Sequence, residues 1–443
     1  MLKRRDFLKL SSAAGAAAVV GQTVAHADSL TAIASAHATL DGLSPDAAAR
    51  DEKYWRTVQQ AFAIDRTLVN LNSGNSSSSP RLVQEALVRD LDVSNRLPVY
   101  YRGQIEQRTG DVRRQLAAEF GCDAEDIAFT RNATEALHIA QSGLDLSPGD
   151  EVVTTDQDYT SMLWAWQQRA LRDKVVVRRV QFPVPATADD LLRRFEQALT
   201  PRTKVLHFCH ITNVTGQLFP VAALSRLARS RGIVTIVDGA QSAAHFPVSL
   251  RDLECDVYGT SLHKWLMAPH GTGFLYVRRE MIPRIWPLHA AVDDRRGDIR
   301  KFEETGTQPA AARAAIADAL RFHQTIGGAR KAARLRYLTL RWVDALKDLP
   351  GTRMLSSLEP DQTWGLATLG LDRDIDAQAL SQRLFDTHRI VTSAVVSQSL
   401  PGPVFDFQGL RITPNVYTTT AEIDAFVAAM RDVFRTGPPR RRT

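Results

Sequence analysis

The sequence predicts an α/β protein with a large domain on a mostly parallel seven-stranded sheet and a smaller α+β domain at the C-terminus. Three observations predict it. Between residues 125 and 280, short β-branched or apolar runs alternate with amphipathic helical patterns, which is typical of a parallel sheet covered on both faces. Past about residue 308 the pattern changes to long helical stretches and then short strands. At 443 residues the chain is also longer than one ordinary core requires.

Seven runs rich in valine, isoleucine and other strand-forming residues supply the predicted sheet. They lie at 126–130, 151–155, 175–180, 205–209, 233–237, 256–260 and 273–277. Helical patterns separate most of them, for example the segment that ends at Gly232, where a glycine can terminate a helix. Ligands of such sheets bind beyond the carboxyl ends of the strands, so the residues that follow each run are the candidates for a site.

The C-terminal domain is predicted from its helices. Residues 310–326 and 329–349 have long helical patterns separated by glycines. The last helix is expected to begin with a capping box, formed by Thr419 and Glu422. We therefore expect five segments: an export signal over 1–27, an N-terminal segment over 28–75, a large domain over 76–308, a small domain over 309–436 and a basic tail over 437–443.

Residues 1–27 are typical of a twin-arginine export signal. Arg4 and Arg5 are adjacent, a weakly apolar, alanine-rich run follows from 13 to 20, and the small residues "AHA" end at Ala27. We therefore expect the twin-arginine translocation machinery as a partner and the periplasm as the location. No other apolar stretch is long enough to span a bilayer, so we expect a soluble protein with no stable membrane insertion.

The formal net charge of +6 is concentrated at the two ends of the chain. Lysines and arginines of the export signal contribute part of it, and three arginines of the basic tail contribute another part. The remainder of the chain is close to neutral, so we expect no basic face for a nucleic acid.

The three cysteines, Cys122, Cys209 and Cys255, cannot form a complete disulfide framework because their number is odd. Cys209 and Cys255 lie in or beside apolar runs, so we expect buried, unpaired thiols. His207 and His210 are close to Cys209 in the sequence, but alternation along a strand would divide these side chains between two faces. We therefore expect no metal site.

An acid and an amine follow two consecutive strands of the predicted sheet. Asp238 comes directly after the run 233–237, where Gly239 would let the chain turn sharply. Lys264 lies just beyond the next run, in the apolar, glycine-containing stretch 260–277. Adjacent strand ends would bring the two side chains into one site. An amine and a carboxylate around a planar ring are what pyridoxal phosphate enzymes require, because the amine binds the aldehyde of the cofactor and the acid keeps the ring nitrogen protonated.

A phosphate group needs several hydrogen-bond donors, preferably at the N-terminus of a helix. The strand that ends at Thr130 is followed by Asn132, Ala133 and Thr134, which open a predicted helix. Because the first amides of a helix have no partner within it, this turn is a candidate for binding the cofactor's phosphate.

Two quoted segments carry a resemblance to a known family. The segment "SLHKWLMAPHGTGFL", with "VDGAQSA" upstream, resembles the class V aminotransferases, the branch of fold type I pyridoxal phosphate enzymes that includes cysteine desulfurases. The likeness is strongest to isopenicillin N epimerase-like proteins and covers roughly residues 60 to 430. It implies a fold type I transferase with pyridoxal 5'-phosphate as cofactor.

The resemblance implies roles around the cofactor's ring. Lys264 would bind the aldehyde covalently, and Asp238 would be the partner of the pyridine nitrogen. Gln241 and Asn213 would lie on the side of the phenolic oxygen. Tyr159 would stack on the face of the ring.

The resemblance also implies contacts further from the ring. Ser261 and His263 would add side-chain donors to the phosphate site. Gly306 and Thr307 match a segment that reaches the site of a partner subunit, which implies a homodimer. Arg411 matches the arginine that binds the substrate carboxylate, a role suited to a bidentate cation.

The resemblance implies an enzyme that acts at the α-amino carbon of an amino acid or of a peptide-linked amino acid. An aminotransferase is the leading prediction. Epimerisation of the isopenicillin N type, elimination of a β-substituent, and an inactive binding relative are the alternatives. Residues 390–410 contain no cysteine, which argues against a desulfurase that accepts sulfur on a thiolate there. Family members with twin-arginine signals include periplasmic enzymes that tailor peptide siderophores, so such a peptide is a candidate substrate.

Overall fold

The computed structural model describes residues 29–441. The predicted export signal and the last two residues of the basic tail lie outside the described residues. Within 29–441, no helix has the combination of length and hydropathy that a membrane span requires.

The large sheet has seven strands in the order β2-β8-β7-β6-β5-β3-β4. Its strands are β2 (Ile127–Thr130), β3 (Glu151–Thr155), β4 (Val176–Val180), β5 (Thr203–Cys209), β6 (Val234–Asp238), β7 (Val257–Ser261) and β8 (Gly273–Val277). Only β8 runs antiparallel to its neighbours, β2 and β7, and the other pairs are parallel. The predicted mostly parallel seven-stranded sheet is therefore confirmed.

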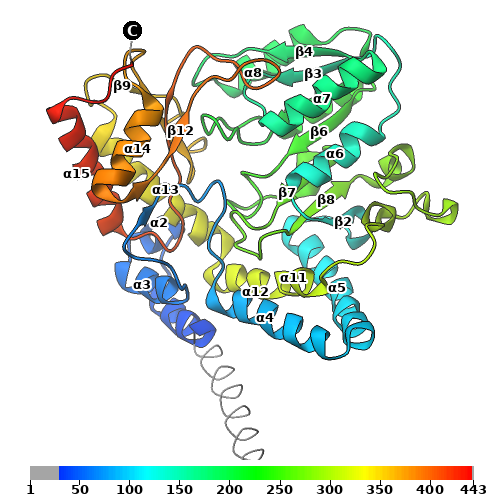
Figure 1. The fold of residues 1–443 in the computed structure, drawn as a ribbon, viewed down its shortest axis with the longest axis horizontal. Helices are drawn as coiled ribbons and strands as arrows, with labels where there is room; N and C mark the ends of the chain where they lie inside the picture. The colour runs from blue at the N-terminus through cyan, green and yellow to red at the C-terminus, as the bar shows by residue number, and fades with distance from the viewer. Residues whose placement is uncertain (1–28, 442–443) are drawn as a thin grey trace, which may run out of the picture.

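Helices cover both faces of this sheet, and Figure 1 shows α6 and α7 side by side on one of them. They are α6 (Ala133–Gly143), α7 (Thr160–Asp173), α8 (Ala188–Ala198), α9 (Val221–Ser230) and the short α10 (Leu250–Leu253). Successive strand residues point to opposite faces: Val152 belongs to the same hydrophobic cluster as Trp166 of α7, and Val153 to the same cluster as Leu224 of α9. Burial on both faces explains why β6 and β8 are mostly apolar, whereas the edge strand β4, most of which is not buried, contains Arg178 and Arg179.

A layer of helices lies below the sheet in Figure 1. It consists of α4 (Arg81–Arg96), α5 (Pro98–Phe120), α11 (Ala310–Ala314) and α12 (Ile316–Ile326). Helix α11 packs against α4 and α5, and α12 contacts the same two helices. Ile316 and Leu320 of α12 are fully buried in the cluster that also contains Phe120 of α5.

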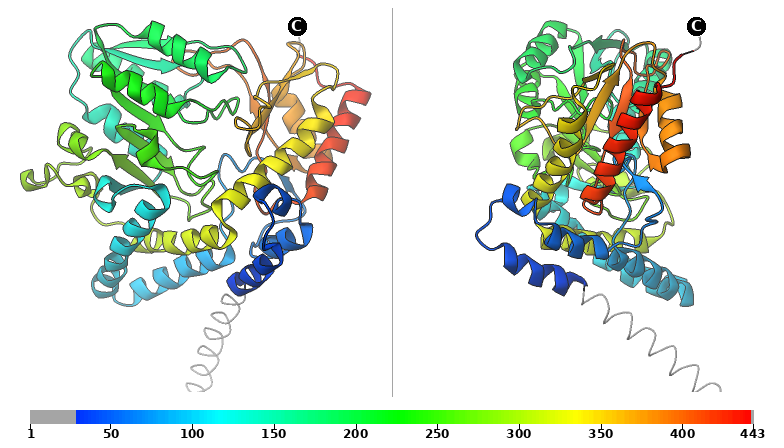
Figure 2. Two further views of the ribbon diagram at one scale, coloured as in Figure 1. Left: turned by 180° about the vertical axis from the view of Figure 1, so that it is seen from behind. Right: turned by 90° about the vertical axis from the view of Figure 1, so that its left-hand side faces the viewer.

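The C-terminal part is built on a four-stranded antiparallel sheet in the order β12-β13-β10-β9. Its elements are α13 (Gly328–Leu346), β9 (Thr352–Met354), β10 (Ala367–Leu371), α14 (Ala377–His388), β12 (Ser393–Val395), β13 (Gly409–Ile412) and α15 (Thr420–Thr436). Thr419 and Glu422 form the predicted capping box of α15. The long helix α13 runs between this part and the rest of the molecule, as both views in Figure 2 show.

The N-terminal segment packs against the C-terminal part. Its elements are α2 (Pro45–Ala48), α3 (Glu52–Gln60) and β1 (Val69–Asn70), and β1 pairs in parallel with β11 (Ile390–Val391). Helix α2 packs on α13. The chain that follows β1 is thereby placed between the C-terminal sheet and the large sheet, where Thr413 donates its amide to the carbonyl of Leu71.

Candidate active site

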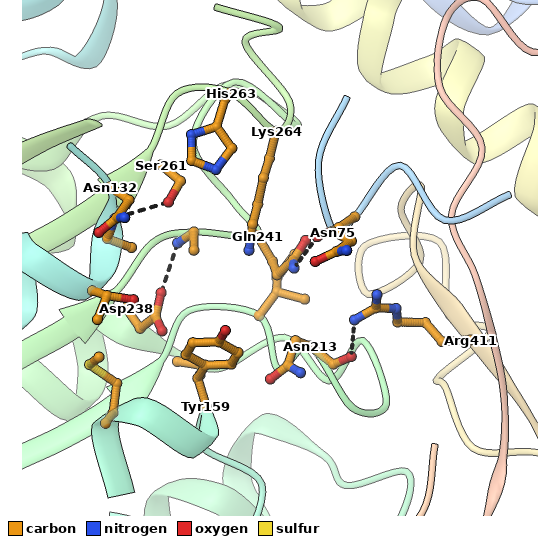
Figure 3. A pocket seen from close by; sticks show the side chains of 17 residues that line it. Asn75, Asn132, Tyr159, Asn213, Asp238, Gln241, Ser261, His263, Lys264 and Arg411 are labelled. Carbon is orange, nitrogen blue, oxygen red and sulfur yellow. Dashed lines mark hydrogen bonds between the residues drawn. The ribbon is translucent and has the colours of Figure 1, made fainter. Parts of the chain in front are cut away.

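A pocket lies at the carboxyl ends of the parallel strands, where the large sheet faces the C-terminal part (Figure 3). The sequence-predicted residues that line it are Asn132, Ala133, Thr134, Tyr159, Asn213, Asp238, Gln241, Ser261, His263, Lys264 and Arg411. All of them except Arg411, which lies within β13, come from the carboxyl ends of five strands of the large sheet or from the segments that follow these ends. The rule that ligands bind beyond the strand ends therefore located the pocket correctly.

Asp238 and Lys264 follow adjacent strands, as predicted. Asp238 is the last residue of β6, and its Oδ1 accepts a hydrogen bond of 2.9 Å from the amide of Ala240. Lys264 follows β7, the neighbouring strand. The chain turns after the acid as predicted, since the amide of Ser242 donates to the carbonyl oxygen of Gly239. Close packing also requires glycine there, because a Cβ on Gly239 would lie 1.9 Å from the Tyr258 ring.

Burial shifts the pKa values of Asp238 and Lys264, and each of the two groups partly offsets the shift of the other. Burial lowers the pKa of the Lys264 amine to about 8, although the nearby Asp238 carboxylate acts in the opposite direction. Burial raises the pKa of Asp238 to about 6, and Lys264 partly offsets this rise. A fraction of the amine is therefore unprotonated near neutral pH, which makes it a nucleophile and a base.

The N-terminus of α6 supplies hydrogen-bond donors to one end of the pocket. The amide of Ala133 donates to Ser261 Oγ at 2.9 Å, and Asn132 caps the helix by accepting from the amide of Glu135. The amide of Thr134 has no acceptor among residues 29–441. This turn approaches the sheet closely because β8 begins with Gly273, where a Cβ would lie 2.8 Å from the Cα of Asn132.

His263 faces the same end of the pocket. Its Nδ1 is buried and has no hydrogen-bond partner in the part of the chain that the structure describes. Burial, together with the neighbouring Lys264, lowers the pKa of His263 to about 4, so the imidazole is neutral near neutral pH. A neutral imidazole with a free nitrogen can bind an oxyanion by donating one hydrogen bond.

Arg411 occupies the opposite end of the pocket, where the C-terminal sheet contributes β13 (Figure 3). Its Nη1 donates to the carbonyl oxygen of Asn213 at 2.9 Å, and its Nη2 donates to Asn72 Oδ1 at 2.8 Å. Its buried Nε has no partner within 29–441. Burial lowers the pKa of Arg411 to about 10, which leaves the guanidinium charged near neutral pH.

Tyr159 and Asn213 line the space between these two ends. Tyr159 is the residue before α7, and Figure 3 shows its ring across the pocket from Lys264. Its side chain is 42% exposed, so the pocket is open on this side. The buried Oδ1 of Asn213 lacks a partner among the described residues, so it is available to a ligand.

Gly306 and Thr307 do not line this pocket. Both are exposed, in the connection between a 3-10 helix (Ile299–Glu303) and α11, and Gly306 has a left-handed φ of 73°. Their predicted contact is with the site of a partner subunit, and it stays a prediction.

Sequence reasoning missed six residues of the lining, which are Gly74, Asn75, Met162, Cys209, Ile211 and Ala240. Gly74 and Asn75 belong to the chain after β1, which the pairing with β11 and hydrogen bonds to Thr413 bring here. Cys209 ends β5, and its position at a strand's carboxyl end was a usable signal. The prediction of buried, unpaired thiols is confirmed for Cys209 and Cys255, and Cys122 is also unpaired but only partly buried. Burial raises the pKa of the Cys209 thiol well above its ordinary value.

Two protein families match the sequence. The family described as "Aminotransferase class-V" matches residues 71–426. The family described as the TAT (twin-arginine translocation) pathway signal sequence matches residues 1–21. The first match covers most of the chain, and the second agrees with the predicted export signal.

The chain matches two curated relatives over nearly the whole length of each. The isopenicillin N epimerase of Streptomyces clavuligerus is 30% identical over 394 residues, which is 85% of this chain and 97% of the relative. A protein of Vibrio cholerae named "Probable cysteine desulfurase" is 30% identical over 394 residues, covering 84% of this chain and 95% of the relative.

Solved structures share the fold. The cysteine desulfurase of Thermococcus onnurineus has a TM-score of 0.74 at 22% identity, and the match covers 86% of this chain and 98% of that one. The lyase C-DES, in a structure with glycine linked covalently to its PLP cofactor, has a TM-score of 0.73 at 24% identity and covers 83% and 97% of the two chains.

The residues of the pocket fit pyridoxal phosphate. The free amide of Thr134, the hydroxyl of Ser261 and the imidazole of His263 would hold the phosphate. Asp238 would hold the ring nitrogen, and Lys264 would supply the amine. The unpaired polar atoms His263 Nδ1 and Asn213 Oδ1 are buried in this pocket and gain partners if the cofactor fills it. The donor set, the fold and the sequence matches agree, and the chain belongs to the class V aminotransferase family of enzymes that depend on pyridoxal phosphate.

Proposed function

We propose that this protein is an exported enzyme that moves the proton at the α-carbon of an amino acid or a peptide-linked amino acid, with transamination as the overall reaction. The observation that carries the proposal is the presence of Lys264, Asp238 and Arg411 in one pocket. Together they supply a base, a partner for the ring nitrogen and a site for the substrate carboxylate.

Arg411 would bind the substrate carboxylate. Its two contacts, with the Asn213 carbonyl and with Asn72, fix the plane of the guanidinium before any substrate arrives. Such preorganisation lowers the entropic cost of binding. The remaining N–H groups of Arg411, including the unpaired Nε, are available for a charge-assisted hydrogen bond.

Lys264 would act as the base at the α-carbon. When bound, pyridoxal phosphate supplies an aldehyde that couples to amines and a ring that withdraws electrons from the α-carbon. A pKa of about 8 suits Lys264 to accept a proton and return it near neutral pH. One base on one side of the pocket is sufficient for transamination, because the proton would leave the α-carbon and return on the same side to the former aldehyde carbon, on the other side of the shared nitrogen. Asp238 would hold the ring nitrogen protonated throughout.

Epimerisation is the second candidate, because the 30% identical relative from Streptomyces clavuligerus is an isopenicillin N epimerase. Inverting the α-carbon requires a proton donor on each face of it. Tyr159 lies across the pocket from Lys264 and carries a hydroxyl, so it is the candidate for the second donor (Figure 3). Elimination of a sulfur substituent through a thiolate is disfavoured, since residues 390–410 lack cysteine and burial raises the pKa of Cys209.

The proposed location is the periplasm, and the proposed assembly is a homodimer. The twin-arginine signal supports export of a folded protein, which suits an enzyme that must acquire its cofactor first. The exposed loop at Gly306 and Thr307 supports a dimer, since it matches the family segment that reaches a partner's site. Sedimentation of the holoenzyme tests the dimer, and a monomer at micromolar concentration contradicts it.

A spectroscopic assay separates the candidate reactions. The holoenzyme is mixed with a panel of D- and L-amino acids, and with short peptides, in D2O, and its absorption spectrum is followed. Conversion of the cofactor to its amine form with release of an oxo acid supports transamination. Incorporation of solvent deuterium at the α-carbon with inversion and no such conversion supports epimerisation. Absence of both with every substrate contradicts the proposal.

A further inference from the structure

The side-chain amide of Gln241 has only one orientation that satisfies its neighbours. The indole Nε1 of Trp265 donates to Gln241 Oε1 at 3.0 Å, and Gln241 Nε2 donates to the carbonyl oxygen of Gly74 at 2.8 Å. An indole N–H only donates and a backbone carbonyl only accepts, so rotating the amide by 180° would break both hydrogen bonds. The nitrogen of the amide is thereby fixed toward Gly74, and its second N–H is left for the pocket that Gln241 lines.

We propose that Trp265, the residue after Lys264, is a positioning residue that holds the Gln241 amide so that an N–H faces the cofactor. Trp265 does not line the pocket, so it acts only through Gln241. The inference requires the family assignment and does not depend on which reaction is catalysed. The N–H of the Gln241 amide would donate to an acceptor oxygen on the cofactor's ring, because the fixed amide presents a donor to that side of the pocket.

The indole is itself held on one face by a histidine. The His245 ring stacks on the Trp265 ring with centroids 3.7 Å apart and planes inclined by 10°. Burial lowers the pKa of His245 to about 3, so this imidazole is neutral. His245 Nε2 accepts the amide hydrogen of Gly365 at 2.7 Å, so its Nδ1 carries the proton and donates to the backbone carbonyl of Gln241 at 2.8 Å. The side chain and the backbone of Gln241 are therefore fixed by the same stack.

Helix α13 supplies a side chain that holds the backbone of Trp265. The amine of Lys331, a fully buried residue of α13, donates to the carbonyl oxygen of Trp265. The same amine contacts His323 Nδ1, and His323 Nε2 lies 3.1 Å from Glu119 Oε1. The indole N–H therefore has little freedom to leave Gln241, because both ends of Trp265 are anchored.

Replacing the indole by a phenyl ring tests the proposal. Trp265→Phe keeps an aromatic ring for the stack but leaves Gln241 Oε1 without its donor. The matched control is Trp342→Phe, because Trp342 is also fully buried and its Nε1 has no partner among the described residues. Both variants lose similar volume, and only Trp265→Phe removes a hydrogen bond. Loss of one hydrogen bond predicts a cofactor dissociation constant about three- to tenfold higher for Trp265→Phe and unchanged for Trp342→Phe.

A double-mutant cycle distinguishes positioning from packing. Gln241→Leu removes the amide, so in that background Trp265→Phe should have no further effect on the cofactor dissociation constant. Equal effects of Trp265→Phe in both backgrounds overturn the proposal, because they show that the indole acts through packing. An effect of Trp342→Phe as large as that of Trp265→Phe also overturns it.

A second measurement does not require any tryptophan variant to fold. In the full chain without cofactor, the indole N–H signals of the seven tryptophans are recorded by NMR together with their hydrogen exchange. Gln241→Leu should accelerate the exchange of the Trp265 indole and leave that of Trp342 unchanged. An unchanged Trp265 exchange rate shows that the two side chains are not bonded and overturns the proposal.

Discussion

Replacing Asp238 by asparagine should stabilise the cofactor-free protein above pH 6. Burial raises the pKa of this carboxyl from its ordinary value of 3.8 to about 6. Between these two pH values the folded protein keeps a proton that the unfolded chain has released, so the free energy of unfolding falls as the pH rises through this window. Each tenfold change in proton affinity corresponds to about 1.4 kcal/mol, so the full cost above pH 6 is about 3 kcal/mol.

Asparagine removes this cost without changing the shape of the side chain. Its Oδ1 can still accept the hydrogen bond from Ala240 that Asp238 accepts at 2.9 Å. Part of the gain is offset, because the carboxylate also favours the charged form of Lys264. The expected gain is therefore about 1 to 3 kcal/mol at pH 8.

Urea unfolding of the cofactor-free proteins between pH 4 and pH 8 measures this gain. The difference between Asp238→Asn and wild type should be smallest at pH 4, grow up to about pH 6.5, and stay constant above it. The same variant should bind the cofactor more weakly, since asparagine cannot supply the negative charge. A variant that is less stable than wild type at pH 8, or a difference that does not change with pH, would show that burial of the Asp238 carboxylate does not destabilise the fold.

Three further predictions concern separate parts of the chain. Arg411→Leu should raise the KM for a carboxylate substrate about 10- to 100-fold and leave the cofactor spectrum unchanged, and an unchanged KM would contradict the assigned role. Lys331→Met should reduce the rise in the free energy of unfolding between pH 7 and pH 10, because burial lowers the pKa of Lys331 to about 7 and the unfolded chain keeps its proton to higher pH. The part of the rise that comes from Lys264, whose pKa burial lowers to about 8, should remain. An equal rise in wild type and variant would contradict it. Replacing Arg4 and Arg5 by lysine should retain the protein in the cytoplasm, which cell fractionation detects, and continued export would exclude the twin-arginine route.

The sequence predicted the large sheet well because its signals are local. Runs that are apolar on both faces identify strands in a parallel sheet, and all seven predicted runs correspond to strands. The position of Asp238 after one run and Lys264 after the next then located the pocket, because parallel strands end at the same edge. The capping box at Thr419 is a local pattern of the same kind.

Contacts between distant segments could not be predicted in this way. Gly74 and Asn75 reach the pocket because β1 pairs with β11, a two-residue contact with no periodic signal in either segment, and because the next residues bond to Thr413. The role of Gly239 also depends on a distant residue, the Tyr258 ring, which fills the space of a Cβ. Likewise, the bond between Trp265 and Gln241 depends on the conformation of the loop that carries Lys264.

The most direct test of the account is to identify the lysine that binds the cofactor. The holoenzyme is reduced with borohydride, digested and analysed by peptide mass spectrometry. Lys331 is an internal competitor, since it is another buried lysine and burial lowers its pKa to about 7. We expect the mass of the reduced cofactor on the peptide that contains Lys264, and we expect no such label in Lys264→Ala. Label on Lys331, or an unlabelled Lys264 in a protein that retains its cofactor, would contradict it.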